Sequence, residues 1–235
     1  MLTDLKGKNY LVVGGGSGIG FSLAEKLQKS GANVFVINRE SNGPEGTTTF
    51  HADILENSDV YDELPDTIDG FAYCPGSINL KPINRITQDD LLGDFKINAV
   101  GAVLATQGIL RKLKKAESAS IVFFSTVAVA TGMGFHTSIA AAKGAVEGIT
   151  RSLAAELANS GIRVNAIAPS LTDTPLAGAL LSSEDKQVAA SKRHPLGRVG
   201  TPADMSDAAY FLLSPNSSWI TGQVIGIDGG LSIIR

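Results

Sequence analysis

The feature that most constrains the fold is a glycine-rich turn between an apolar run and a helix-like segment near the N-terminus. The run Asn9–Val13 leads directly into the sequence GGGSGIG at 14–20, and apolar residues of helical spacing continue from Ile19 to Leu27. Glycine lets a chain turn sharply and approach a ligand closely, and a helix N-terminus offers free N–H groups with a partial positive charge. In this context the turn predicts a binding site for the pyrophosphate of a dinucleotide.

The rest of the chain alternates between short apolar runs and segments of helical periodicity. The expected strands are Asn9–Val13, Asn33–Ile37, Thr47–His51, Gly70–Cys74, Ser120–Ser125, Arg163–Ala168 and Val224–Ile227. Several are apolar nearly throughout, as strands buried on both faces are. The pattern predicts the α/β class: a Rossmann-type, doubly wound, seven-stranded parallel sheet in three α/β/α layers, forming a single dinucleotide-binding domain over residues 1–235. Only the Gly/Pro/Asn-rich segment Arg39–Thr47 lacks the helix that would ordinarily cross over.

Charge and cysteine content narrow the partners and the compartment. The 20 basic and 23 acidic residues give a net charge of −3, which does not indicate a nucleic-acid or membrane partner. Cys74 is the one cysteine, so no intramolecular disulfide is possible, and we expect a cytoplasmic protein. The N-terminal apolar stretch is too short for a signal peptide or a membrane span. No metal site is expected.

Several motifs together resemble the classical short-chain dehydrogenase/reductase family, and in particular its 3-oxoacyl-[acyl-carrier-protein] reductases. The spacing of Gly14, Gly18 and Gly20 is similar to the family fingerprint, although Val13 stands where members usually carry Thr. The sequences HPLGRVGTPADMSDAAYFLLS at 194–214 and ITGQVIGIDGG at 220–230 resemble the C-terminal third of those reductases. The resemblance spans the whole chain. It implies a nicotinamide dinucleotide, a small-molecule substrate and a homo-oligomer, usually a tetramer.

The resemblance also implies which residues bind the cofactor. Asp53 would meet the adenine amino group, and the segment 169–174 would lie near the nicotinamide, with Ser170 in place of the family's Gly. The family's N-N-A-G after the fourth strand is replaced by Tyr73-Cys74-Pro75-Gly76. The expected cofactor-binding residues are Gly14, Gly16, Ser17, Gly18, Ile19, Gly20, Asn38, Arg39, Asp53, Ile54, Cys74, Pro75, Gly76, Asn98, Lys143, Pro169, Thr172 and Thr174.

The end of the second strand bears on the choice between NADP and NAD. An acidic residue there would accept hydrogen bonds from the ribose hydroxyls of NAD and repel a 2′-phosphate, and Asn38 is not acidic. The guanidinium of Arg39 is suited to that phosphate, whereas Glu40 directly after it argues the other way. We expect NADP(H) in preference to NAD(H).

Family members reduce carbonyls with an Asn, Ser, Tyr and Lys set, because hydride addition creates an oxyanion that must be stabilised and protonated. By resemblance the Asn is Asn98, the Lys is Lys143, and the Ser position falls on Thr126, beside Ser125. The Tyr position, four residues before Lys143, holds Ile139, which cannot donate a proton.

A substitute acid is therefore sought among nearby polar residues. His136 is at the position where enoyl-reductase relatives place their Tyr, seven residues before Lys143, and histidine can serve as an acid near neutral pH. The alternative is that His136 merely lines the mouth of the cleft. Ser138 and Tyr73 are further polar candidates. The expected catalytic residues are Asn98, Thr126, Lys143 and His136.

Three functions are consistent with this pattern. The first is an NADP(H)-dependent oxidoreductase acting on a carbonyl/alcohol or activated enone substrate, with His136 or a water held by Thr126 as the displaced acid. The second is a catalytically weak or inactive dinucleotide-binding sensor or partner subunit, which Ile139 favours. The third is a lyase or isomerase that keeps NADP as a structural element. The segment Leu176–His194 is expected to form a mobile lid over the substrate, without identifying it.

Overall fold

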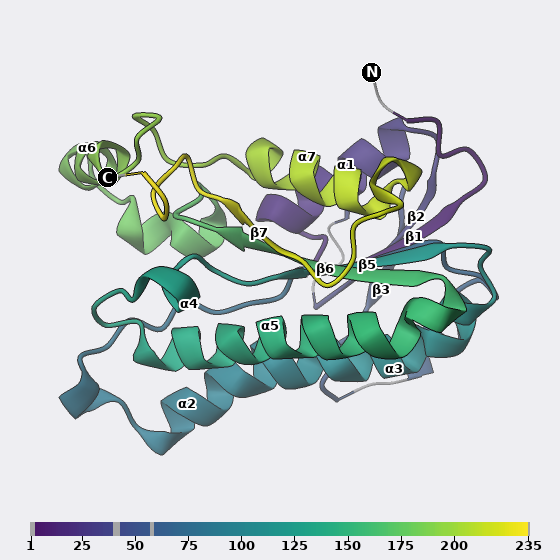
Figure 1. The fold of residues 1–235 in the computed structure, drawn as a ribbon, viewed down its shortest axis with the longest axis horizontal. Coiled ribbons are helices and arrows are strands. Elements are labelled where there is room, and N and C mark those ends of the chain that lie inside the picture. Colours follow the sequence, from purple (N-terminus) through teal and green to yellow (C-terminus); the bar gives the residue numbers. More distant parts are fainter. Residues whose placement is uncertain (1–2, 40–42, 57–58, 235) are drawn as a thin grey trace.

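The computed structural model describes residues 3–39, 43–56 and 59–234, and it is built on one parallel sheet covered by helices on both faces (Figure 1). The strands are β1 (Asn9–Val13), β2 (Asn33–Asn38), β3 (Thr48–His51), β4 (Gly70–Tyr73), β5 (Ala119–Phe124), β6 (Ile162–Pro169) and β7 (Val224–Ile227). Their order is β3-β2-β1-β4-β5-β6-β7, and all six neighbouring pairs are parallel. The predicted fold class is confirmed. The order reverses between β1 and β4, and in such sheets ligands bind outside the carboxyl ends of the strands at that point.

Seven α-helices assemble around the sheet in the described part of the chain. They are α1 (Gly18–Lys29), α2 (Gln88–Phe95), α3 (Gly101–Lys114), α4 (Ala128–Thr131), α5 (Thr137–Leu157), α6 (Glu184–Lys192) and α7 (Pro202–Leu213). In Figure 1, α1 and α7 cover one face and the long helices α3 and α5 cover the other, with α2 continuing into α3. A single π-helical turn at Lys96–Val100 joins α2 to α3. No helix within the described ranges is long and apolar enough to cross a membrane.

Strand side chains alternate between two apolar cores, one under each helical layer. On β1, Leu11 and Val13 belong to the core beneath α3 and α5, while Tyr10 and Val12 belong to the core beneath α1 and α7. Phe71 and Phe123 meet edge to face in the first core, with ring centroids 6.4 Å apart. A central parallel strand is buried on both faces, which explains why the predicted strands are apolar nearly throughout.

Local signals in the sequence set the helix starts. Thr87 and Thr201 each cap a helix through a reciprocal capping box, in which the carboxylates of Asp90 and Asp204 accept from the cap backbone. Gly31, which follows α1, has φ +84, a conformation that favours glycine. Between β2 and β3 the described residues form no helix, as predicted; residues 40–42, including Glu40, lie outside the described ranges.

Candidate functional site

A cavity of about 400 Å³ lies at the carboxyl ends of β1, β2 and β4, where the strand order reverses. Most of the predicted cofactor residues line it: Gly14, Gly16, Ser17, Gly18, Ile19, Gly20, Asn38, Arg39, Asp53, Ile54, Cys74, Pro75, Gly76 and Thr174. Asp53 is the only acidic residue among the described residues of this wall. Sequence reasoning missed its apolar floor, which includes Ile37, Ala52 and Ile97.

The glycine-rich turn has the backbone geometry that close approach to a ligand requires. Gly14 and Gly18 have φ values of +78 and +53. A Cβ at Gly14 would lie 3.0 Å from Pro75, and one at Gly20 would collide with the carbonyl oxygen of Gly14. The turn therefore exposes bare backbone in front of the N-terminus of α1, an arrangement that fits a pyrophosphate.

A second cavity of about 630 Å³ adjoins the first, and Ile19, Cys74, Gly76, Thr174 and Leu176 border both. It is lined mainly by apolar side chains, with a few polar groups that converge on it. The remaining predicted site residues on this wall are Thr126, His136, Lys143, Pro169 and Thr172. Asn98 lines neither cavity among the described walls and lies buried behind them.

Lys143 extends from α5 to the wall of the second cavity, close to Gly76, which borders both cavities. Its ammonium donates to the carbonyl oxygen of Phe124 at 2.7 Å, and the side chain is buried. Burial lowers the pKa of Lys143 to about 8, against the opposing effect of Cys74 and Asp94. A Cβ at Gly76 would lie 3.5 Å from this ammonium and 3.2 Å from Oδ1 of Asn98, so glycine lets the chain cross directly over both groups.

The π-helical turn places Asn98 beneath Gly76. Its amide donates to the backbone oxygen of Asp94 at 2.7 Å and to the Ser77 hydroxyl at 3.0 Å. Oδ1 of Asn98 is buried and has no hydrogen-bond partner within the described ranges. A buried acceptor of this kind is costly without a donor, so the site fits a ligand or ordered water that donates there.

The Tyr position is apolar in the structure as in the sequence. Ile139 is 5% exposed and forms part of the wall of the second cavity. Neither Ser138 nor Tyr73, two further candidates for the acid, points its hydroxyl at that cavity. The Tyr73 hydroxyl donates to the carbonyl oxygen of Ile97 at 2.6 Å, and burial raises its pKa far above the usual value. Both residues are therefore removed as proton donors.

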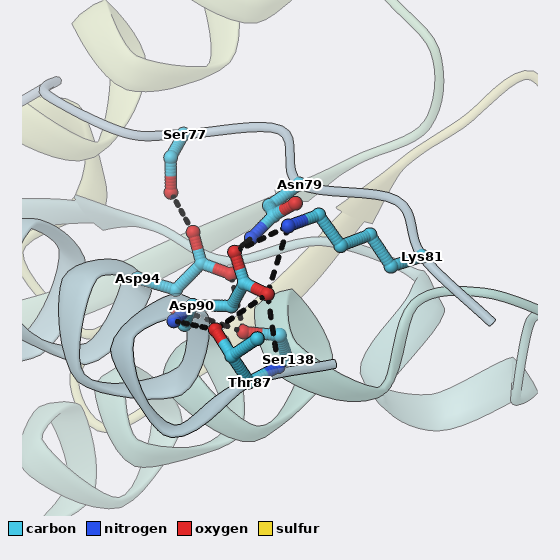
Figure 2. Close-up of polar contacts among 7 residues, drawn as sticks. All are labelled: Ser77, Asn79, Lys81, Thr87, Asp90, Asp94 and Ser138. Carbon is cyan, nitrogen blue, oxygen red and sulfur yellow. Dashed lines mark hydrogen bonds and ion pairs between the residues drawn. The ribbon is translucent and has the colours of Figure 1, made fainter. Parts of the chain in front are cut away.

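Ser138 instead belongs to a polar network between α2 and α5, drawn in Figure 2. The buried carboxylate of Asp94 accepts from the hydroxyls of Ser138 and Ser77. The neighbouring carboxylate of Asp90 accepts from Lys81, Asn79 and the cap residue Thr87 (Figure 2). The network anchors the strand-to-helix segment above Asn98, which accounts for the position of that amide.

His136 and Thr126 are the polar groups that face the second cavity near Ile139. His136 precedes α5, and its Nδ1 lies 2.7 Å from the carbonyl oxygen of Gly134. Because a carbonyl only accepts, Nδ1 carries the hydrogen, and Nε2 has no partner among the described residues. The Thr126 oxygen accepts from the backbone N–H of Ala128 at 3.3 Å, which leaves its hydroxyl hydrogen available, whereas the Ser125 hydroxyl is committed to Glu147 at 2.8 Å.

The predicted lid segment covers the second cavity with α6 and the preceding 3₁₀ turn at Pro175–Leu180. One site residue in it was missed. His194, the last residue of this segment, is 3% exposed. Its Nε2 lies 2.9 Å from Oγ of Ser170, which follows β6, and both residues line the second cavity. The sequence signals were Ser170, the departure from the family's glycine, and the motif that begins at His194, but nothing in the spacing of 24 residues connects the two side chains.

Comparison with known proteins adds relatives that cover the whole chain. A family model described as enoyl-(acyl carrier protein) reductase matches residues 14–232. The 2,5-dichloro-2,5-cyclohexadiene-1,4-diol dehydrogenase of Sphingobium indicum is 32% identical over 250 residues, covering 99% of this chain and 100% of that protein. The 3-oxoacyl-[acyl-carrier-protein] reductase MabA of Mycobacterium avium is 31% identical over 232 residues, covering 96% and 90%.

Solved structures agree on the fold. The ligand-free aldohexose dehydrogenase of Thermoplasma acidophilum superposes with a TM-score of 0.92 at 27% identity, covering 99% of this chain and 97% of that chain. A putative 2-deoxy-D-gluconate 3-dehydrogenase of Agrobacterium tumefaciens with bound NADP gives 0.88 at 28% identity, covering 97% of each.

Proposed function

Since the chain belongs to the short-chain dehydrogenase/reductase family, we propose that it is an NADP(H)-dependent oxidoreductase of a carbonyl/alcohol or activated enone substrate. The observation that carries the proposal is that the two cavities adjoin at Cys74 and Gly76, with Lys143, Thr126 and His136 on the wall of the second. Relatives named as dehydrogenases and reductases, and one named with NADP bound, support it.

The residues of the first cavity would hold the dinucleotide. The backbone of the glycine-rich turn would bind the pyrophosphate and Asp53 the adenine amino group, and Lys143, on the adjoining wall of the second cavity, would bind the nicotinamide ribose. The cofactor, when bound, exchanges a hydride with the substrate carbon. The buried ammonium of Lys143 adds positive charge close to the reacting oxygen, where a low dielectric strengthens its effect.

The second cavity would handle the oxygen and its proton. The Thr126 hydroxyl donates to the substrate oxygen and holds it in place. When its ring carries both hydrogens, His136 supplies the proton from Nε2, directly or through one water, and is left neutral with its Nδ1 hydrogen held by the carbonyl of Gly134. Ile139 packs against the substrate and contributes no proton.

Arg39 is the basis for NADP(H). Its side chain is exposed on the wall of the first cavity and has no ion-pair partner in the described part of the chain. A guanidinium in that position can bind a 2′-phosphate with two hydrogen bonds.

Three further features belong to the same proposal. Residues 1–235 form a single domain in this proposal, and the segment 176–194 is its lid. The proposed location is the cytoplasm. We also propose a homotetramer. Large apolar side chains are exposed on α2, α3 and the turn between them, and near the C-terminus: Leu91, Leu92, Phe95, Val100, Leu104, Trp219, Ile233 and Ile234. Such patches are typical of subunit interfaces.

Ile139 favours a second candidate, a dinucleotide-binding protein with little or no turnover that acts as a sensor or partner subunit. Fluorescence titration with NADPH and NADH, followed by assays on ketones, acetoacetyl thioesters and enones, separates the two. Binding with consumption of NADPH supports the enzyme. Tight binding without consumption supports the sensor, and failure of both nucleotides to bind contradicts the proposal.

A further inference from the structure

The wall of the second cavity is chemically uneven. Its lid end carries Lys186, Arg193 and His194, and no Asp or Glu is among the described residues that line it. Away from the lid the wall is largely aliphatic, with Ile78, Leu80 and Ile139, and its polar groups include those of the proposed reaction site, Thr126, His136 and Lys143. A volume of about 630 Å³ is in the range of cavities that enclose small organic ligands. The size and lining of the cavity therefore suit a molecule with an apolar body and an anionic end.

The cations at the lid end differ in how they are engaged. The ammonium of Lys186 donates to the carbonyl of Ala179 at 3.0 Å and to the Ser182 hydroxyl at 2.9 Å, so it holds α6 against the preceding turn. Arg193, directly after α6, is exposed; its backbone N–H donates to the carbonyl oxygen of Ala190, but its guanidinium makes no hydrogen bond or ion pair with any described residue. Its guanidinium is thus the free charge at this end of the cavity.

Beside Arg193 lies a built hydrogen-bond pair. Nδ1 of the buried His194 is 2.9 Å from the carbonyl oxygen of Ala190, so Nδ1 carries a hydrogen, and Nε2 is 2.9 Å from Oγ of Ser170. When the ring is neutral, Ser170 donates to Nε2. When the ring carries both hydrogens, Nε2 donates to Ser170, and the hydroxyl hydrogen is free for a ligand. Asp228 is nearby, but its carboxylate accepts from the backbone of Gly230 and Ser232 and it does not line the cavity.

We propose that the substrate is an amphipathic anion whose negatively charged head group binds the guanidinium of Arg193, and that the Ser170 hydroxyl donates to it when the His194 ring carries both hydrogens. Its apolar chain then lies along the aliphatic wall, and its carbonyl reaches Thr126 and His136. This inference rests on the proposed function, because it assigns the second cavity to the substrate. A carboxylate and a phosphate ester share the required chemistry, and the test below distinguishes them.

The test measures binding by calorimetry, using octanoate, octyl phosphate and the neutral 1-octanol as probes. The full-length protein is used with and without NADP⁺. An anionic probe should bind at least about tenfold more tightly than octanol, since a charge-assisted hydrogen bond contributes about 1.5–3 kcal/mol and each 1.4 kcal/mol is tenfold. Preference for octyl phosphate over octanoate would identify a phosphate head group, and the reverse order a carboxylate.

Variants make the assignment specific. Arg193→Ala should weaken binding of the preferred anion about tenfold and leave the affinity for octanol unchanged. Ser170→Ala should weaken binding of the same anion about threefold. Lys192→Ala is the matched control, because Lys192 is exposed on the same helix, one residue away, and does not line the cavity. Arg193→Gln repeats the test should the alanine variant lower the melting temperature.

Two results would overturn the inference: equal affinity for octanol and both anions, or an equal loss in the Lys192 and Arg193 variants, which would indicate diffuse charge attraction. A parallel NADPH titration reports on the proposed function separately. If NADPH fails to bind while the anion preference persists, the proposed function fails and the head-group site remains.

Discussion

The two cavities of the cleft, one for the cofactor and one for the substrate, are built in different ways on the same fold. At the ends of β1, β2 and β4 the wall includes five glycines, and most residues expected there by resemblance line a single cavity, although Val13 and the segment 73–75 depart from the family. At the ends of β5 and β6 the wall is made of side chains, and it departs from the family at Ile139 and Ser170. A site made of backbone geometry tolerates little change, whereas a site made of side chains can change chemistry without disturbing the sheet.

His136→Ala gives the largest expected effect on the side-chain half. A positioned general acid contributes about 10²–10⁴ in rate, so kcat should fall by that range while NADPH affinity stays within twofold. His136→Gln is the matched variant that keeps a polar side chain. Steady-state kinetics and nucleotide titration on the same samples check the prediction, and unchanged kcat in both variants would remove His136 from the mechanism.

Ile139→Tyr would restore the hydroxyl at the family position. Because Ile139 lines the cavity and lies one helical turn from Lys143, we expect this change to raise kcat by about tenfold or more in the His136→Ala background, where the general acid is missing. Ile139→Phe adds the ring without the hydroxyl. A gain shared by both variants would mean that ring size, not proton donation, limits the reaction.

Gly20→Ala probes the backbone half. The added Cβ would meet the carbonyl oxygen of Gly14, and overpacking of this kind costs about 1–3 kcal/mol. NADPH affinity should fall about tenfold, as measured by fluorescence titration. Gly148→Ala on α5, where a Cβ meets nothing within 4 Å, is the control and should leave affinity unchanged. Equal binding by the Gly20 variant would refute the pyrophosphate assignment.

Arg39→Ala should separate the two nucleotides. Loss of the guanidinium should weaken NADPH about tenfold and leave NADH affinity unaltered, because only NADPH carries the 2′-phosphate. Arg85→Ala, at an exposed arginine that lines neither cavity, is the control. A parallel loss for NADH would show that Arg39 acts through the loop and not through the phosphate.

The smallest effect concerns pH. The pKa of Lys143 is lowered to about 8 by burial, so the group is charged below that pH and neutral above it. If the charged form binds the ribose, NADPH affinity should decline severalfold between pH 7.5 and pH 9. The Lys143→Met variant should bind NADPH more weakly at all pH values, and its affinity should no longer depend on pH in this range. A variant that retains the same pH profile would assign the titration to another group.

The sequence predicted the sheet well because several strands are apolar nearly throughout, and β5 was placed to within one residue at each end. The helix starts at Thr87 and Thr201 are also encoded locally, since each depends on a capping box between residues three apart in the sequence. The glycine-rich turn was identified because the backbone conformation that requires glycine lies within the turn itself.

The arrangement of side chains around the second cavity was harder to predict from the sequence. Whether a hydroxyl faces a cavity depends on its neighbours in space, which is why Ser138 and Tyr73 remained candidates until their partners Asp94 and Ile97 were known. The pairing of Ser170 with His194 arises from the return of the lid segment across β6, and no periodicity encodes it.

The most direct test of the account is a single-turnover reaction with NADPH that carries deuterium at C4 of the nicotinamide, with the product analysed by mass spectrometry. The account predicts a product heavier by the transferred deuterium, formed despite Ile139. Full binding of the labelled NADPH with no label in any product of the ketone, thioester and enone panel would contradict it.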